Sequence, residues 1–122
     1  LGLYKTTVDG MFEEQSAPQT MGDRQGLRQL TLDNNSTKLQ ITTEGMVAFS
    51  LSHFDDAQFN YDVFYGGKHP YDLVRSNQIF AHFDFWQRGI GNRSCGGDSC
   101  LPQYMTPTGA HEFTLRFTPM AK

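Results

Sequence analysis

The side chains with the greatest chemical reactivity lie in one stretch, residues 83–104, with the sequence FDFWQRGIGNRSCGGDSCLPQY. An aromatic, strand-like segment there leads into glycines, polar residues and two cysteines, and loops on rigid β scaffolds commonly carry binding sites. Ser94 or Cys95 can act as a nucleophile only beside a positioned histidine, which the order of residues does not supply. Cys95 and Cys100 can close a small disulfide loop in an oxidising compartment or remain two thiols, and both alternatives stay open. The stretch is therefore a candidate site at the edge of a β scaffold.

Two groups of histidine and aspartate residues have side chains that can bind metals. His53 lies near Asp55 and Asp56, and His82 lies two residues before Asp84. Neither group has enough ligands at a diagnostic spacing, and exposed or helix-capping roles account for the same residues. Glycoside chemistry requires two carboxyl groups roughly 5–10 Å apart, and no pair of acids in the chain has a context that singles it out. The sequence therefore favours neither a metal site nor a catalytic carboxylate pair.

Two further patterns resemble binding motifs. Gly89 and Gly91 begin like a phosphate-binding loop, but the third glycine and the helix pattern of a dinucleotide site do not follow, so we reject that site. Several aromatic residues can offer a stacking platform for a sugar, although aromatic residues at period-two spacing more commonly belong to a core. These aromatic residues are Phe83, Phe85, Trp86 and Tyr104.

Composition excludes several classes of protein. The 122 residues are 38% hydrophobic and 13% aromatic, which is enough for one compact domain. The net charge is -3 and the Lys and Arg residues are scattered from Lys5 to Lys122, so we expect no nucleic-acid partner. No apolar run approaches the roughly 20 residues of a membrane helix, so we expect no membrane partner. Because the chain begins at Leu1 rather than Met, we expect an excised piece of a longer protein in preference to a processed product.

Period-two patterns predict short strands and almost no helix. Residues 1–8 have a β pattern, and residues 27–52 are predicted to form a three-stranded antiparallel meander with turns at 33–36 and 44–45. Asp55, with Gln58 three residues later, predicts a capping box and the only helix of the chain, from Asp55 to about Asn60.

Two later strands complete the predicted fold. From Val74 or Ser76 to Trp86, both faces of the alternating pattern carry large apolar groups, so this strand is expected to be buried between two layers. The last strand, residues 112–118, is expected to place its apolar side chains inside, namely Phe113, Leu115 and Phe117. Six or so short strands with strong turn chemistry predict an all-β, antiparallel β-sandwich.

The string FDFWQRGIGNRSCGG resembles a signature in the C-terminal domain of the large β-galactosidases of glycoside hydrolase family 2. Other motifs of that domain follow in order over nearly all of the chain, from LGLYKTTVD through Pro18, Gly22 and the segment 49–73 to the ending FTLRFTP. Each motif is weak alone, but the ordered set is fairly specific. The matching residues of the signature are Asp84, Gln87, Gly89, Gly91, Ser94, Cys95 and Gly96.

This resemblance implies a fold and an accessory function. The family's domain is a β supersandwich of the galactose mutarotase-like type, about twice as long as this chain, which would be its C-terminal half. The catalytic glutamates of the family lie in an upstream (β/α)8 barrel, so the chain alone is expected to be non-catalytic. With that barrel, the chain is expected to help hydrolyse terminal β-galactosides by shaping the aglycone side of the active site.

The same resemblance implies substrate-binding residues, namely Cys95, Ser94, Asp23 and Arg24, in the segments 22–28 and 89–97. In the family, an aromatic residue at the Cys95 position stacks on the aglycone side of the sugar, and a glutamate at the Thr20 position lies near the pocket. The chain departs from the family at both positions. Loss of a stacking indole removes about 1 kcal/mol of aromatic contact.

Cofactors and partners follow from the resemblance as well. It implies no cofactor in these residues, with Mg and Na in other domains of the parent enzyme, and a carbohydrate partner, a galactoside, bound together with the upstream barrel domain. A free-standing half-domain would leave apolar faces uncovered, which favours a homo-oligomer. The expected location is cytoplasmic or periplasmic in a bacterium. The alternative functions are a non-catalytic carbohydrate-binding module and a structural interface module.

Overall fold

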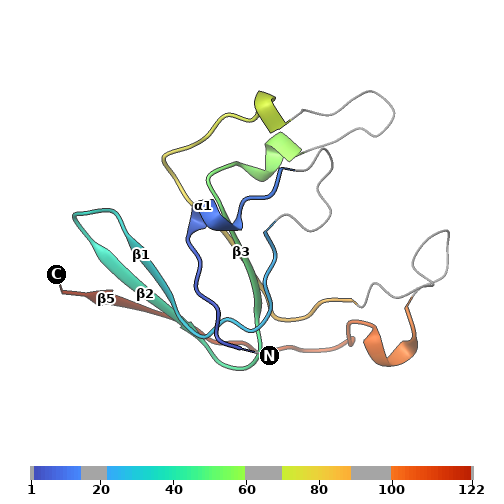
Figure 1. Ribbon diagram of the computed structural model, residues 1–122. Helices are drawn as coiled ribbons and strands as arrows, with labels where there is room; N and C mark the ends of the chain where they lie inside the picture. Colours follow the sequence, from blue (N-terminus) through green and yellow to red (C-terminus); the bar gives the residue numbers. More distant parts are fainter. Residues whose placement is uncertain (1, 15–21, 60–69, 89–99, 122) are drawn as a thin grey trace. The chain divides into compact units, whose positions relative to one another are not determined.

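Two small sheets carry the regular β structure of the chain (Figure 1). The computed structural model describes residues 2–14, 22–59, 70–88 and 100–121. One sheet has the order β1-β2-β5, and the other pairs β3 with β4. The predicted all-β, antiparallel class is confirmed, whereas the supersandwich half-domain stays a prediction. The strands are β1 (Leu30–Asp33), β2 (Lys38–Thr43), β3 (Ala48–Ser52), β4 (Phe80–Asp84) and β5 (Leu115–Met120).

The chain divides into two compact units. Unit 1 consists of Leu1–Gln25 and Ala48–Phe83, and unit 2 consists of Gly26–Val47 and Asp84–Lys122. No helix among the described residues is long and apolar enough to cross a membrane. Each unit has its own small set of buried apolar side chains. Those described are Met11, Ala48 and Leu51 in unit 1, and Leu27, Ile41, Val47 and Cys100 in unit 2.

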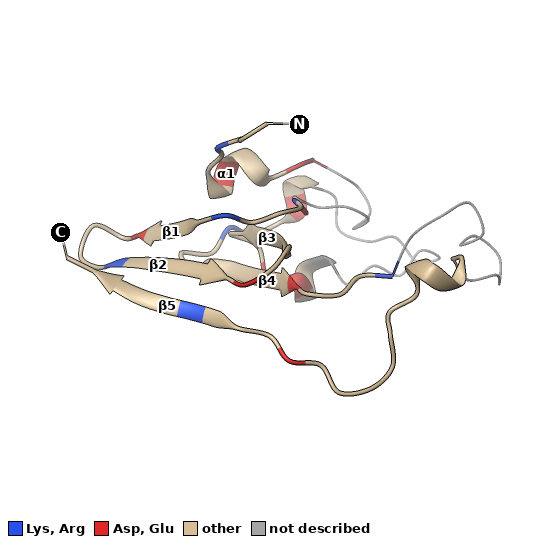
Figure 2. Ribbon diagram, turned by 90° about the horizontal axis from the view of Figure 1, so that it is seen from below, with Lys and Arg blue, Asp and Glu red and all other residues tan. Residues whose placement is uncertain are grey.

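In unit 2, β2 lies between β1 and β5 (Figure 2). Ile41, which is buried, pairs with Leu30 of β1 and with Phe117 of β5, and both pairings are antiparallel. The predicted meander of residues 27–52 is therefore correct for its first two strands and wrong for its third. The third strand, β3, pairs with β4 instead.

Backbone contacts before β1 explain this difference. The amides of Gly26 and Leu27 both donate to the carbonyl oxygen of Val47 at 3.0 Å. The chain that follows the turn at Gly45 therefore bonds with the approach to β1 rather than with β2. The period-two pattern predicted that this strand begins at Leu27. Because Gly26 and Leu27 bond to Val47 instead, β1 begins at Leu30.

The predicted turn between β1 and β2 is confirmed. The Asn34 side-chain oxygen accepts hydrogen bonds from the backbone amides of Ser36 at 3.1 Å and Thr37 at 2.8 Å. Asn35 has a φ of 68°, in the left-handed region that short amide side chains tolerate. The Asp33 carboxylate accepts from the Asn35 amide at 2.9 Å, so two neighbouring side chains, Asp33 and Asn34, organise the hairpin turn.

In unit 1, the β pattern predicted for residues 1–8 is wrong. Residues 2–7 form no strand, and α1 (Val8–Met11) follows as a single helical turn. Thr7 caps this turn because its hydroxyl oxygen accepts a hydrogen bond from the Gly10 amide at 3.1 Å. Met11 is 1% exposed, and α1 packs against β3 (Figure 1).

The predicted helix of residues 55–60 is a short 3-10 helix, η1 (Asp56–Phe59). The Asp55 side chain accepts a hydrogen bond from the Ala57 amide at 2.9 Å. The Gln58 side chain, however, does not form the predicted capping box. The Gln58 side-chain amide instead donates to the Val74 carbonyl at 2.9 Å and accepts from the Val74 amide at 2.7 Å. This pair of bonds to a distant segment replaces the local cap. The prediction of only one helix is also wrong, because α1, η2 (Pro70–Asp72) and η3 (Pro102–Tyr104) are present as well.

The two late strands are less buried than predicted. In β4, Phe80 and Phe83 are half-buried while the residues between them are exposed, so the strand is not covered on both faces. In and before β5, Leu115 is half-buried as predicted, but Phe113 and Phe117 are 58% and 56% exposed. Alternation in a sequence indicates which side chains share a face of a strand, but it does not indicate what covers that face.

Candidate functional site

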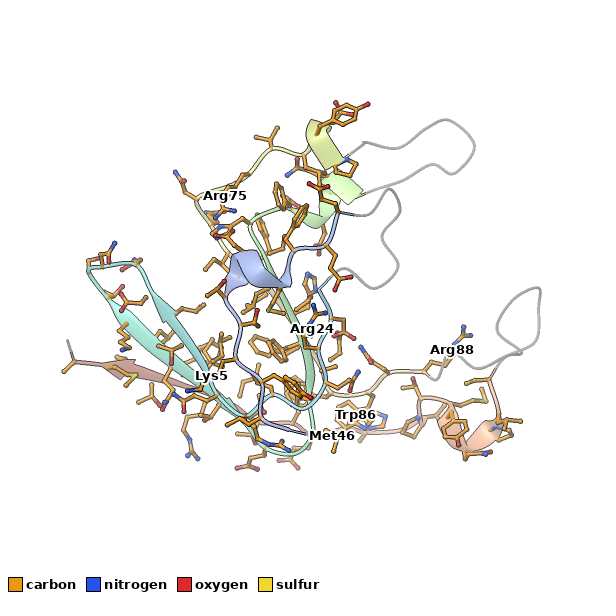
Figure 3. All side chains as sticks on the ribbon, viewed as in Figure 1. Lys5, Arg24, Met46, Arg75, Trp86 and Arg88 are labelled. Atoms are coloured by element: carbon orange, nitrogen blue, oxygen red, sulfur yellow. The ribbon has the colours of Figure 1, made fainter. Side chains whose placement is uncertain are left out.

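The described part of the predicted substrate site is centred on Arg24 in unit 1. The Arg24 amide donates to the Phe49 carbonyl and the Phe49 amide donates to the Arg24 carbonyl, both at 2.9 Å. Phe49 belongs to β3, and Figure 3 shows Arg24 next to this strand. The two backbone bonds therefore fix the main chain of Arg24 against a sheet.

A glycine directs the chain toward Arg24. Gly22 has a φ of +69°, and a Cβ atom at this position would lie 2.8 Å from the Met11 carbonyl oxygen. Both the backbone angle and the close approach to Met11 require a residue without a side chain. Because Gly22 and Met11 are both buried, the tight contact connects the start of the site segment to α1.

The Arg24 guanidinium is oriented by two contacts. Its Nη2 lies 2.9 Å from the Glu13 Oε1, and its Nη1 donates to the Asp23 carbonyl oxygen at 2.9 Å. The side chains of Arg24 and Glu13 are each 40% exposed, so the pair is accessible from solvent. A guanidinium has five N–H donors, so two contacts do not use its full donor capacity.

Sequence reasoning placed Asp23 and Arg24 in the site but missed Glu13. The structure brings the three residues together, with Asp23 half-buried beside Arg24. Glu13 lies in a segment without periodicity or a motif, so the sequence contains no signal for its role. Ser94, Cys95 and Thr20 lie outside the described residues, as does the segment 89–97, and their roles stay predictions.

The histidine and aspartate residues considered as metal ligands make other contacts. His53 Nδ1 lies 3.2 Å from the carbonyl oxygens of both Ser76 and Gln78, so this nitrogen carries a proton and donates. His82 Nε2 lies 2.8 Å from the Asp56 Oδ2. Within residues 2–14, 22–59, 70–88 and 100–121, no three His, Cys, Asp or Glu side chains are grouped so that they could hold a metal.

A second ion pair in unit 1 joins Asp9 of α1 to Arg75. The Arg75 Nη1 lies 2.5 Å from the Asp9 Oδ1. The hydrogen bond from Arg75 lowers the pKa of Asp9 below its ordinary value of 3.8. Desolvation acts against this shift, and the charges of Arg75 and His53 add to it. Asp9 therefore stays ionised to a lower pH than an isolated aspartate.

In unit 2, Cys100 is buried at the end of the glycine-rich stretch. Its sulfur lies 3.3 Å from the Tyr104 carbonyl oxygen, across the short helix η3. Cys95 lies outside the described residues, so the disulfide and the two-thiol alternatives both stay predictions.

The described strands form antiparallel sheets, and the half-exposed Arg24 lies on a segment attached to one of them. Such an arrangement is typical of an all-β protein whose binding residues lie on loops. The chain matches the family described as Beta galactosidase small chain over residues 1–118. It therefore belongs to the β-galactosidase small-chain family, and the predicted resemblance is confirmed. Membership in this family indicates an accessory role in a glycoside hydrolase. No curated protein matches the chain.

Proposed function

We propose that this chain shapes the aglycone side of the active site of a β-galactosidase whose catalytic glutamates lie in another part of the parent enzyme. The family match over residues 1–118 supports the parent activity. The observation that carries the specific role is Arg24, which is fixed through both its main chain and its side chain while 40% of the side chain is exposed. A positioned and accessible donor is what a binding site requires.

In this proposal Arg24 donates hydrogen bonds to hydroxyl groups of the sugar that leaves. Glu13 and the Asp23 carbonyl hold the guanidinium in one orientation, so less side-chain freedom is lost when a ligand binds. Cys95 stands where the family has a stacking aromatic residue, and a thiol offers much less contact area than an indole. Recognition of the aglycone therefore depends more on hydrogen bonds here than on stacking.

The first experiment measures the kinetics of the full-length parent enzyme with Arg24→Ala. We expect KM for lactose or galactobiose to rise roughly tenfold to a hundredfold, as for the loss of a hydrogen bond to a charged donor, with kcat little changed. A nitrophenyl galactoside, whose aglycone has no sugar hydroxyl groups, should respond less. Arg116→Ala is the matched control, because Arg116 is an exposed arginine on β5. An equal effect of Arg24→Ala on both substrates would contradict a role in recognising the aglycone.

Deletion tests the accessory role itself. The parent enzyme without residues 1–122 should lose hydrolysis of a chromogenic β-galactoside, and the chain alone should show none. Full activity after deletion would contradict the proposal and would leave a structural or carbohydrate-binding module as the function. Activity of the chain alone would show that catalytic groups lie within it.

A further inference from the structure

Unit 2 contains a cluster of aromatic rings beside β5. The rings of Phe85 and Phe113 stack with their centroids 4.5 Å apart and an interplanar angle of 30°. The Trp86 ring lies 4.5 Å from the His111 ring and 6.0 Å from the Phe85 ring. The cluster thus joins the segment after β4 to the segment before β5, and Figure 3 shows Trp86 at this place. We call these four residues the aromatic cluster.

The aromatic cluster is not a closed core. Trp86 is 40% exposed and Phe113 is 58% exposed, although such ring contacts in a core would exclude water. The sequence pattern allowed either a core or a stacking platform, and the exposure of these two rings favours the platform. Rings that pack on each other while remaining accessible are held in place before any ligand arrives.

Polar groups lie at the edge of the same cluster. His111 Nε2 lies 2.9 Å from the Pro107 carbonyl oxygen, so this nitrogen carries a proton, and in the neutral ring Nδ1 is then a hydrogen-bond acceptor. Asp84 and Gln87, on either side of Phe85 and Trp86 in the sequence, are exposed and lie 3.4 Å apart at their side chains. An aromatic surface bordered by donors and acceptors is suited to a ligand with one apolar face and many hydroxyl groups.

We propose that the aromatic cluster binds a galactose unit of an oligosaccharide through Trp86, with His111 as a hydrogen-bond acceptor. The face of an aromatic ring is negatively polarised. A galactopyranose gathers C–H bonds, which are weakly positive, on the face opposite its axial hydroxyl group, so that face complements the indole. The choice of a galactoside rests on the proposed function of the chain, whereas the binding surface itself does not.

The size of the cluster also fits a sugar better than a protein. Three of its residues are exposed, Trp86, His111 and Phe113, and each of their rings is similar in size to one sugar ring. A stable protein interface buries roughly 1,000 Å² or more. The site would hold part of a galactoside chain in unit 2, and its role would be to retain the substrate rather than to cleave it.

The test uses the fluorescence of Trp86, which is the single tryptophan of the chain. Titration of the 122-residue chain with galactobiose should give a saturable change in emission with a Kd in the millimolar range, and cellobiose should bind several-fold more weakly. His111→Ala should raise the Kd for galactobiose about fivefold, as for the loss of one hydrogen bond. Phe113→Ala should raise it by a similar factor, because Phe113 supports the ring arrangement through Phe85. Tyr4→Ala is the matched control, because Tyr4 is an exposed aromatic residue of unit 1, and it should leave the Kd unchanged.

Three outcomes would overturn the proposal. They are the absence of a saturable change, an equal response to cellobiose, and a shift of the emission with protein concentration in the absence of sugar, which would indicate that a second copy covers the cluster. Trp86→Ala, followed by calorimetry, provides an independent measurement, since the loss of Trp86 should raise the Kd at least tenfold. Kinetics of the parent enzyme with Arg24→Ala test the aglycone role separately, so failure of one proposal does not imply failure of the other.

Discussion

Both units contain paired strands, but they differ in the contacts that add to this pairing. In unit 1, side chains join segments that are far apart in the sequence, as in the pairs Arg24–Glu13 and Asp9–Arg75 and in the two bonds between Gln58 and Val74. In unit 2, the backbone of β2 pairs with both β1 and β5, and the three strands form the larger of the two described sheets.

This difference has a functional consequence. Side-chain pairs place charged groups at defined positions and leave them partly accessible, which a binding site for a polar ligand requires. Backbone hydrogen bonding between strands depends little on the side chains. The exposed faces of a sheet can therefore carry different kinds of residue. In our two proposals, unit 1 supplies charged groups for hydrogen bonding to the ligand, and unit 2 supplies the aromatic cluster for stacking.

Replacement of two glycines by alanine, one in each unit, should give the largest changes in the free energy of unfolding. Gly22 in unit 1 and Gly45 in unit 2 both have positive φ angles, of +69° and +83°. At Gly22 an added Cβ would meet the Met11 carbonyl oxygen at 2.8 Å, whereas at Gly45 nothing lies within 4 Å. Gly22→Ala should lower the free energy of unfolding by about 3 kcal/mol, and Gly45→Ala by about 1 kcal/mol, which is the cost of the left-handed angle alone.

Urea unfolding of the two variants and of the unchanged chain measures both values. Because the backbone strain is nearly the same at the two positions, the difference between the variants reports the clash with α1. Equal losses of stability would show that the segment at Gly22 moves away from Met11 at no cost. The close contact would then not position Arg24.

A substitution in the turn between β1 and β2 of unit 2 should have a smaller effect on the free energy of unfolding. Asn34→Ala removes the oxygen that accepts from the Ser36 and Thr37 amides, so the free energy of unfolding should fall by about 1 kcal/mol. Asn34→Asp keeps an acceptor oxygen and should retain most of the stability. Urea unfolding measures the three proteins, and a loss as large in Asn34→Asp as in Asn34→Ala would contradict a role for the acceptor oxygen.

Local features of the fold could be predicted from the sequence. The Asn34 turn, the alternation in β1 and β2 and the all-β class depend on residues that are close in the chain, and local chemistry determines them. The third strand of the predicted meander failed because the choice between β3 and β5 as the partner of β2 depends on contacts distant in sequence. The Val47 carbonyl, which bonds to Gly26 and Leu27, is one such contact.

The candidate site could be predicted only in part, for a related reason. The resemblance to the family identified Asp23 and Arg24, and the structure then showed how Phe49 and Glu13 hold Arg24. Glu13 has no neighbour in the sequence that indicates its role, since its partner Arg24 lies 11 residues later in the chain. The exposure of Trp86 was equally hidden, because an alternating pattern does not report what covers a strand.

The smallest expected effect is the pH dependence of the Asp9–Arg75 pair in unit 1. Arg75 lowers the pKa of Asp9 in the folded chain below 3.8, the ordinary value that the unfolded chain retains. The stabilising contribution of Asp9 is therefore fully present above pH 3.8 and is lost as the pH falls through the lower folded pKa. Arg75→Gln should raise the pKa of Asp9 toward 3.8, which NMR titration of its carboxyl group measures directly.

The same substitution changes how stability depends on acid. Because its Asp9 has nearly the same pKa folded and unfolded, Arg75→Gln should lose less stability than the unchanged chain when the pH falls from about 5 to about 2.5. Arg116→Gln on β5 of unit 2 removes an exposed arginine without affecting Asp9, so it should keep the steeper dependence. Identical acid sensitivity in all three proteins would mean that the pair does not contribute to folding. The side-chain contacts of unit 1 would then orient charged groups at the surface without stabilising the fold.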